Sequence, residues 1–319
     1  MKESEIKRLY IIGNGFDCYG HCLPTKYSDF SRYLKNKYPN YVKNFQGTLE
    51  SIMMPDGDEQ YNMDEAVGAI IFLLDNCAGD EWNLLETCLS DDYIRTIIDK
   101  HSFWFNNLDT EDSNDDDTFH NLHDNEDMAT NLSGGYLILK KLFIEWVQEA
   151  LGNLNYEEVL KILTPSFENS LFLSFNYTDT LEAVYDIDSN RICHIHGSCH
   201  SEENDIFFGH GGIEPVEADT TYWGIQDAFE HLWNYLKKDT NKAISRHMVF
   251  FHKLSDVKEI YSYGFSFSDV DMVYIEMISM MVNPSKVKWF FNKYDWDNNY
   301  EYVAKIQKFG YSVCKTEIW

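Results

Sequence analysis

Short apolar runs that end in glycine or a small polar residue recur along the chain, and they are typical of buried strands in a parallel sheet. The first run, residues 9–12, leads directly into the turn Gly13-Asn14-Gly15. From residue 170 onward, further runs alternate with stretches of helical periodicity, which favours a mostly parallel sheet. The later candidate strands are residues 171–175, 191–195, 206–208, 259–263, 287–291 and 311–314.

Apolar positions at helical spacing predict the elements between these strands. Residues 27–37 place Tyr27, Phe30 and Leu34 on one face, and residues 136–151 carry a wider apolar face. Residues 41–106 also read as helical. By contrast, residues 109–127 hold nine carboxylates and almost nothing aliphatic, which predicts a solvated, flexible segment.

Together these patterns predict an α/β protein. A Rossmann-like, mostly parallel sheet would be flanked by helices, with a helical insertion between the first strand and the rest of the sheet. The nucleotide-binding domain would comprise residues 1–40 and 165–319. The insertion would comprise residues 41–164, with the acidic flexible segment at 109–127.

Composition narrows the function classes. The chain has 319 residues, 44% of them hydrophobic, and its formal net charge is −27. That charge disfavours nucleic acid and anionic membranes as partners, whereas backbone amides at a helix N-terminus can still hold a small anionic ligand. Seven cysteines without a Cys-x-x-Cys pair are typical of free thiols in a reducing compartment. Because the N-terminus is charged and no apolar run is long enough to span a bilayer, we expect a cytoplasmic protein.

Glycine or a polar residue follows several of the predicted strands. Because the carboxyl ends of parallel strands meet at one edge of a sheet, we expect these residues to converge there. A dinucleotide across that edge is the natural physical interpretation. The long loop over residues 14–25, which contains Phe16, Asp17 and Thr25, would lie beside it. The strand-end residues are Gly13, Asn14, Gly15, Asn176, His196, Gly197, Gly264, Ser266 and Asn292.

Purely structural interpretations remain open for the same residues. The turn at residues 13–15 can be a flexible loop that ends a strand. Asn176 can be a turn residue ahead of a helix capped by Thr178 or Asp179. His196 can be a buried histidine whose ring nitrogens are hydrogen-bonded.

Two histidine pairs raise the question of a metal. Alternation along the strand places His194 and His196 on one face, but the sequence offers no obvious third ligand. The pair His120 and His123 lies in the segment expected to be flexible, where nothing fixes a single geometry. We therefore predict no metal.

The order and identity of these pieces resemble the AbiH family of bacterial abortive-infection (phage defence) proteins. Five segments that span nearly the whole chain carry the resemblance. They are Ile11-Ile12-Gly13-Asn14-Gly15-Phe16-Asp17, Leu23-Pro24-Thr25-x-Tyr27-Ser28-Asp29-Phe30, Ser174-Phe175-Asn176-Tyr177-Thr178, His194-Ile195-His196-Gly197 and Gly264-Phe265-Ser266-x-Ser268-Asp269-x-Asp271.

The chain is more distantly similar to SIR2-like domains, which bind NAD. In that family a Gly-x-Gly loop holds the pyrophosphate, which implies this role for residues 13–15. The similarity also implies site roles for Asn176 and for the pair His196-Gly197, and a contact near the distal ribose for residues 264–266. This sequence lacks the four-cysteine zinc module of SIR2 deacetylases, so the similarity implies the NAD hydrolysis of SIR2-like defence proteins and not deacetylation.

The implied function is that of a phage-defence effector, a toxin with a SIR2-like pocket that hydrolyses NAD, its substrate, to nicotinamide and ADP-ribose. Asn176 would orient the attacking water or hold the ribose hydroxyls, and His196 would act as general base. Asp17 is a further candidate for a hydroxyl contact. An alternative is a non-catalytic sensor of a dinucleotide or an ADP-ribose derivative. By analogy, further copies of the chain or a phage-derived trigger are candidate partners.

Overall fold

The computed structural model describes residues 6–43, 49, 51–55, 59–76, 86, 89, 91–106, 115–157, 159, 161, 167–212 and 222–317. The chain forms two compact units, each assembled from segments that are distant in sequence. Unit 1 comprises Met1–Lys26, Glu145–Phe207 and Asp239–Trp319, and unit 2 comprises Tyr27–Ile144 and Phe208–Lys238. Residues 27–40 and 208–238 thus fall in unit 2, and residues 145–164 fall in unit 1, so the units have other bounds than the expected domains.

Unit 1 contains a six-stranded sheet in which all neighbouring strands are parallel, as the sequence predicts. Its strand order is β5-β4-β1-β6-β7-β8. Numbered by appearance in the chain, the six strands lie in the order 3-2-1-4-5-6, that of a Rossmann-like fold. The strands are β1 (Arg8–Ile12), β4 (Ser170–Ser174), β5 (Ile192–His194), β6 (Glu259–Tyr263), β7 (Lys288–Phe291) and β8 (Ser312–Lys315).

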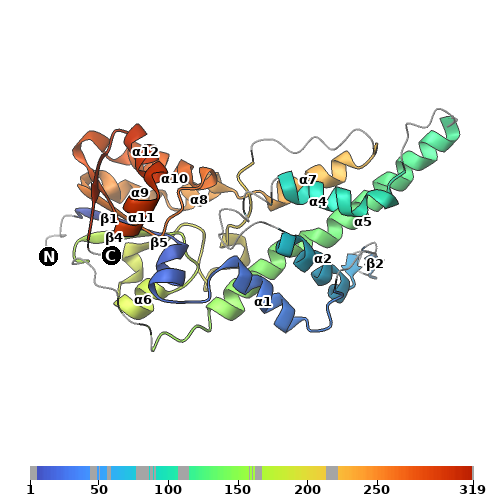
Figure 1. Cartoon of the computed structure of the whole chain (residues 1–319), viewed down its shortest axis with the longest axis horizontal. Coiled ribbons are helices and arrows are strands. Elements are labelled where there is room, and N and C mark those ends of the chain that lie inside the picture. Colours follow the sequence, from blue (N-terminus) through green and yellow to red (C-terminus); the bar gives the residue numbers. More distant parts are fainter. Residues whose placement is uncertain are drawn as a thin grey trace. The chain divides into compact units, whose positions relative to one another are not determined.

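Both faces of this sheet are buried, which explains why its strands read as continuous apolar runs. Leu9 and Ile11 of β1 belong to one hydrophobic cluster, and Tyr10 and Ile12 belong to the other. Figure 1 shows α9, α10 and α12 on one side of the strands and α6 on the other. The helices of unit 1 are α6 (Thr180–Tyr185), α8 (Thr240–Arg246), α9 (Met248–His252), α10 (Met272–Met281), α11 (Lys293–Asn298) and α12 (Tyr300–Lys308).

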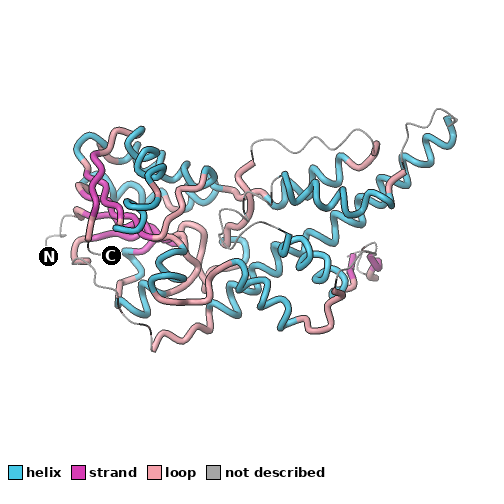
Figure 2. Tube along the Cα trace, viewed as in Figure 1, coloured by secondary structure: helices cyan, strands magenta, loops and turns pink. Residues whose placement is uncertain are grey.

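Unit 2 is mainly helical and is built along the long helix α5 (Figures 1 and 2). Phe30 of α1 packs against Phe143 of α5, and His101 of α4 hydrogen-bonds Tyr136 of α5 at 3.0 Å. The elements among the described residues of this unit are α1 (Tyr27–Lys37), β2 (Ser51–Met53), β3 (Glu59–Tyr61), α2 (Met63–Asn76), α4 (Asp91–His101), α5 (Asp115–Trp146) and α7 (Gln226–Leu236). Strands β2 and β3 pair as an antiparallel hairpin in a region predicted to be helical throughout.

Helix α5 begins earlier than its sequence pattern suggests. It starts at Asp115, so residues 115–127 are helical, while residues 109–114 lie outside the described part. Asn125, Ala129 and Leu132 are fully buried at helical spacing. The Asn125 side chain also bonds the backbone of Asn106, donating to its oxygen and accepting from its nitrogen. These few contacts hold the helix in place. They are hard to recognise in the sequence because the segment is rich in carboxylates.

Residues 206–208 are not a strand, contrary to the prediction. The run is buried but belongs to no ladder. Phe207 donates its backbone N–H to the oxygen of His196 and accepts at its own oxygen from the Tyr177 hydroxyl. The two phenylalanines serve different units: Phe207 joins a cluster of unit 1, and Phe208 stacks on Phe143 within unit 2. At this apolar run the chain therefore leaves unit 1 and enters unit 2.

The loops after β1 and β6 approach each other so closely that only glycine fits. A Cβ on Gly264 would lie 2.3 Å from the nitrogen of Phe16, and one on Gly13 would lie 2.4 Å from the oxygen of Gly264. Gly264 also has a φ of 63°, which other residues rarely adopt. The glycines of both loops are therefore required by the packing of one backbone against the other.

We predict that Gly264→Ala costs more stability than Gly310→Ala. Both positions have positive φ, which costs an alanine ~1–2 kcal/mol. A Cβ on Gly310 meets nothing closer than 4.0 Å, whereas a Cβ on Gly264 meets backbone atoms that can shift only with both loops. We expect Gly264→Ala to lower the free energy of unfolding by ~1–3 kcal/mol more than Gly310→Ala does. Urea unfolding of the two variants measures the difference, and equal losses would contradict the close packing.

Candidate functional site

The carboxyl ends of β1 and β6 mark the point where the strand order of the sheet reverses. Ligands of open α/β sheets bind in the crevice outside such a point. Here the two loops are tied together, because Gly13 N–H donates to Tyr263 oxygen and Gly15 N–H donates to Gly264 oxygen, both at 3.0 Å. Phe16 N–H donates to Gly13 oxygen at 3.0 Å, and the Phe16 side chain is fully buried. These three amides are thus already engaged within the protein.

Asp17 lies fully buried in the helical turn that follows β1. One of its carboxylate oxygens accepts a hydrogen bond from Thr178, which in turn accepts one from Thr180 at 3.1 Å. Burial raises the pKa of Asp17 to about 6, although the hydrogen bonds from Thr178, Thr180 and Asn176 act in the opposite direction. The carboxyl therefore titrates close to neutral pH, in the range that suits acid–base chemistry.

Asn176 lies beside this carboxyl, directly after β4, and is 6% exposed. Its Nδ2 donates to the backbone oxygen of Gly13 at 3.1 Å, which fixes the orientation of the amide. Its Oδ1 is buried and has no hydrogen-bond partner within the described part of the chain. A buried acceptor of this kind is costly unless a water or a ligand satisfies it.

The two histidines of the β5 segment contact opposite sides of the sheet, contrary to the alternation argument. Strand β5 ends at His194, and Gly197 then turns the chain with a φ of 86° and an N–H bond to His194 oxygen. His194 bonds Glu182 of α6 at 3.0 Å through Nε2, while Nδ1 donates to Asn176 oxygen at 3.0 Å. Burial lowers the pKa of His194, but Glu182, the Asn176 backbone oxygen and Asp179 together more than compensate, so that this pKa lies above its ordinary value.

His196 faces the other helical layer and is 4% exposed. Its ring packs edge-on against Phe175 and Tyr274. Nε2 lies 3.4 Å from an oxygen of the buried Asp271, which also accepts a hydrogen bond from Ser268 at 3.0 Å. A carboxylate at this distance stabilises the protonated form of an imidazole, which is a property that a general base needs.

A further cluster, formed by Asp179, Cys199 and His200, was missed as a group by sequence reasoning. An oxygen of Asp179 lies 2.6 Å from His200 Nε2 and 3.5 Å from Cys199 Sγ. Burial and then the Asp179 carboxylate raise the pKa of Cys199 to about 12, so that by itself the thiol is neutral. Nothing in the sequence spacing connects Asp179 with the other two residues, because only the pairing of β4 with β5 brings them together.

A scan against family models finds one family that covers most of the chain. The model described as "Bacteriophage abortive infection AbiH" matches residues 9–293. The chain belongs to the AbiH family. The matched region begins in β1 and runs just past Asn292, so it includes every strand end discussed above. No curated protein and no solved structure matches the chain in the parallel comparisons.

The remaining residues of this AbiH protein that were predicted to contact a ligand differ in their burial and in their hydrogen bonds. Asn292 caps α11, since its side chain accepts from the N–H of Asp295 at 2.9 Å and donates back to that carboxyl. Thr25 is buried and donates its N–H to the oxygen of Leu23. Asn14 and Ser266 are half-buried polar residues of the two loops at the strand-order reversal. Their contacts with a ligand stay predictions.

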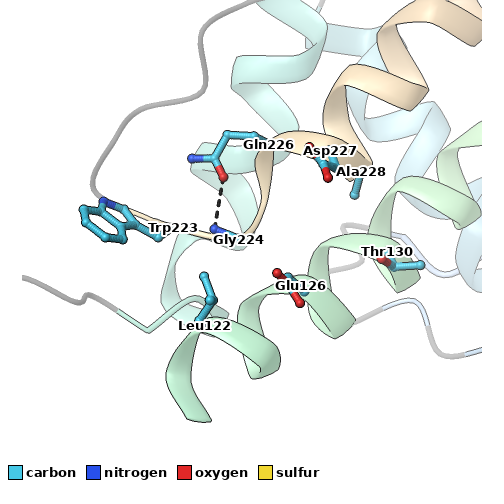
Figure 3. A pocket seen from close by; sticks show the side chains of 8 residues that line it. All are labelled: Leu122, Glu126, Thr130, Trp223, Gly224, Gln226, Asp227 and Ala228. Atoms are coloured by element: carbon cyan, nitrogen blue, oxygen red, sulfur yellow. Dashed lines mark hydrogen bonds between the residues drawn. The ribbon is translucent and has the colours of Figure 1, made fainter. Parts of the chain in front are cut away.

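Unit 2 of the AbiH protein holds a pocket of about 670 Å³ that the sequence did not suggest (Figure 3). Glu126 and Thr130 of α5 line it together with residues from the start of α7, where Gln226 accepts from the N–H of Gly224 at 3.0 Å. Its charged lining residues, Glu126 and Asp227, are both acidic. This lining does not suit the phosphates of a nucleotide.

No helix in the described residues is long and apolar enough to cross a membrane.

We predict that Asp17→Asn stabilises the protein more at high pH than at low pH. The folded-state pKa of Asp17 is about 6, because burial raises it above the ordinary value of an aspartate carboxyl. The folded state therefore binds this proton more tightly, and stability falls as pH rises through that window. The Asp17→Asn variant does not undergo this pH-dependent loss of stability. We therefore expect its free energy of unfolding, relative to that of the wild type, to grow by roughly 1 kcal/mol from pH 5 to pH 8.

Urea unfolding at several pH values measures this change. Asp256→Asn removes the same charge at an exposed position and provides the matched control. An Asp17→Asn difference that is constant with pH would show that the carboxyl does not titrate as its burial demands.

Proposed function

We propose that this AbiH family member acts in abortive infection by hydrolysing NAD to nicotinamide and ADP-ribose. The observation that carries the proposal is the position of Asn176 and His196 at the carboxyl ends of neighbouring strands. Asn176 is oriented by its hydrogen bond to Gly13 oxygen, and His196 lies 3.4 Å from an oxygen of Asp271. A phage-derived trigger and further copies of the chain are the partners that belong to this proposal.

The reaction breaks the bond between nicotinamide and C1′ of the ribose, and water supplies the new C1′–O bond. Nicotinamide leaves as a neutral molecule with the electron pair of the broken bond, and the proton of the attacking water passes to His196. Asp271 stabilises the imidazolium that forms, at the 3.4 Å separation described above. The transition state resembles an oxocarbenium ion, so the protein's main task is to position the reactants and to exclude bulk water.

Asn176 and Asp17 supply the polar contacts of this mechanism. The free Oδ1 of Asn176 is the acceptor for the attacking water or for a ribose hydroxyl. Asp17 is the second acceptor for a ribose hydroxyl and supports the same region through Thr178. Since the amides of Gly13, Gly15 and Phe16 are engaged, the proposal assigns the pyrophosphate to the half-buried Asn14 and Ser266.

The burial of both residues favours a second candidate function, a sensor that binds a dinucleotide or an ADP-ribose derivative without turning it over. Asn176 and His196 are only 6% and 4% exposed. Such a protein would bind NAD and release no nicotinamide. The two functions therefore differ in a product that can be measured directly.

We predict that the protein releases nicotinamide from NAD and that His196→Ala and Asn176→Ala each slow this release by ~10²–10⁴-fold. Asp271→Asn should lower kcat with little change in KM, because Asp271 acts through His196. Matched controls are Asn190→Ala and His252→Ala, exposed residues just before the amino ends of β5 and β6, away from the site.

Release is measured by chromatography with the purified protein and with extracts of phage-infected cells that express it, because a defence effector can require its trigger. Full turnover in both site variants would refute the residue assignment. Binding of NAD without product in either preparation would favour the sensor.

A further inference from the structure

The three potential ligands of the Asp179–Cys199–His200 cluster already lie close to one another. Their nearest ligand atoms, one from each side chain, all fall within 4.8 Å of one another. A tetrahedral zinc site with bonds of about 2.0–2.3 Å separates its ligand atoms by about 3.3–3.8 Å. The 3.5 Å between Cys199 Sγ and Asp179 Oδ2 already matches this spacing. The 2.6 Å between Asp179 Oδ2 and His200 Nε2 is shorter, so the imidazole would have to move outward by less than 1 Å.

The imidazole is free to make that movement. The His200 side chain is 69% exposed, the Asp179 side chain 22%, and Cys199 only 5%. Solvent exposure thus increases from the buried thiol to the exposed histidine, so one side of the cluster is open to solvent. Catalytic zinc sites have the same composition of three protein ligands and one open position.

The backbone around the cluster is held in place without a cation. Cys199 N–H donates to Tyr177 oxygen at 2.7 Å, which ties the turn after β5 to the segment after β4. Asp179 N–H donates to the hydroxyl of Tyr156 at 3.1 Å, and His200 N–H donates to Ser198 Oγ at 3.3 Å. Ligands that are positioned in advance lower the cost of binding an ion.

The electrostatic surroundings also favour a cation. The carboxylates of Asp179 and Glu182 both act on Cys199 and disfavour its negative charge unless a cation is present. A thiol, an imidazole and a carboxylate together suit zinc, whereas magnesium and calcium prefer oxygen ligands alone.

From this geometry we propose that Asp179, Cys199 and His200 form a binding site for Zn²⁺ with an open fourth position. This inference departs from the expectation of no metal and is independent of NAD hydrolysis. Once bound, the ion links the segment that carries Asn176 and Thr178 to the turn that carries His196. Its first effect is to fix these two segments relative to each other.

The test is a titration of the metal-free full-length protein with Co²⁺, a zinc substitute whose bond to a thiolate gives a near-ultraviolet charge-transfer absorption. We expect one Co²⁺ per chain with this absorption, and Zn²⁺ should displace it. Cys199→Ser should abolish the band. Cys314→Ser, which changes a half-buried cysteine on the edge strand at the other end of the sheet, should retain it.

His200→Ala and Asp179→Asn should each weaken Co²⁺ binding by at least about tenfold, whereas His252→Ala should not. Zn²⁺ should also raise the unfolding temperature of the wild type, and this rise should be lost in His200→Ala. His200 is exposed, so its variant stays informative even if Cys199→Ser does not fold.

Absence of the thiolate band with excess Co²⁺, or its persistence in Cys199→Ser, would overturn the proposal. Binding is measured without NAD, and nicotinamide release is measured separately, both with Zn²⁺ and with a chelator. Failure of one proposal is therefore distinguishable from failure of the other.

Discussion

The contact of the β1 loop with the β6 loop is the constraint on which the site depends. These strands are neighbours at the centre of the sheet, and their chain order reverses there. Their loops share two backbone hydrogen bonds and a separation that excludes any Cβ at Gly13 or Gly264. This contact fixes the backbone oxygen of Gly13, which then orients Asn176, and it places Asp17 in the turn that follows. A Gly-x-Gly sequence after a first strand can thus be required by the protein's own packing, apart from any need to approach a phosphate.

Around this contact the structure buries several groups that prefer water, and most of them have a partner. His194 is paired with Glu182, His196 lies beside Asp271, and Asp17 accepts from Thr178. Buried polar groups cost free energy unless they are satisfied, so such a concentration is unusual where only packing is at stake. The pKa of Asp17, about 6, shows that its partners only partly offset burial. Functional sites commonly tolerate this kind of cost.

Local sequence patterns determine the strands but not their neighbours. The prediction of β6 as residues 259–263 agrees with the structure, because an apolar run buried on both faces has few alternatives. The run at 206–208 has the same local pattern and fails, because its two phenylalanines pack into different units. Parallel pairing was enough to predict that Asn176 lies at a strand end. It was not enough to predict the cluster of Asp179, Cys199 and His200. That cluster depends on the register of β4 with β5, which places Ser174 opposite His194 and is a tertiary contact.

The two proposals meet in the short segments that follow β4 and β5. Asn176 and Asp179 are three residues apart on one segment, and His196 and His200 are four apart on the other. The proposed NAD hydrolysis would use the first member of each pair, and the proposed zinc site would use the second. A cation held between the second members would restrain the first members without touching the substrate, since the loss of chain freedom extends over the few residues between them. Zinc would therefore change the rate of nicotinamide release through the positions of Asn176 and His196, in contrast to a zinc-bound water that itself attacks the ribose.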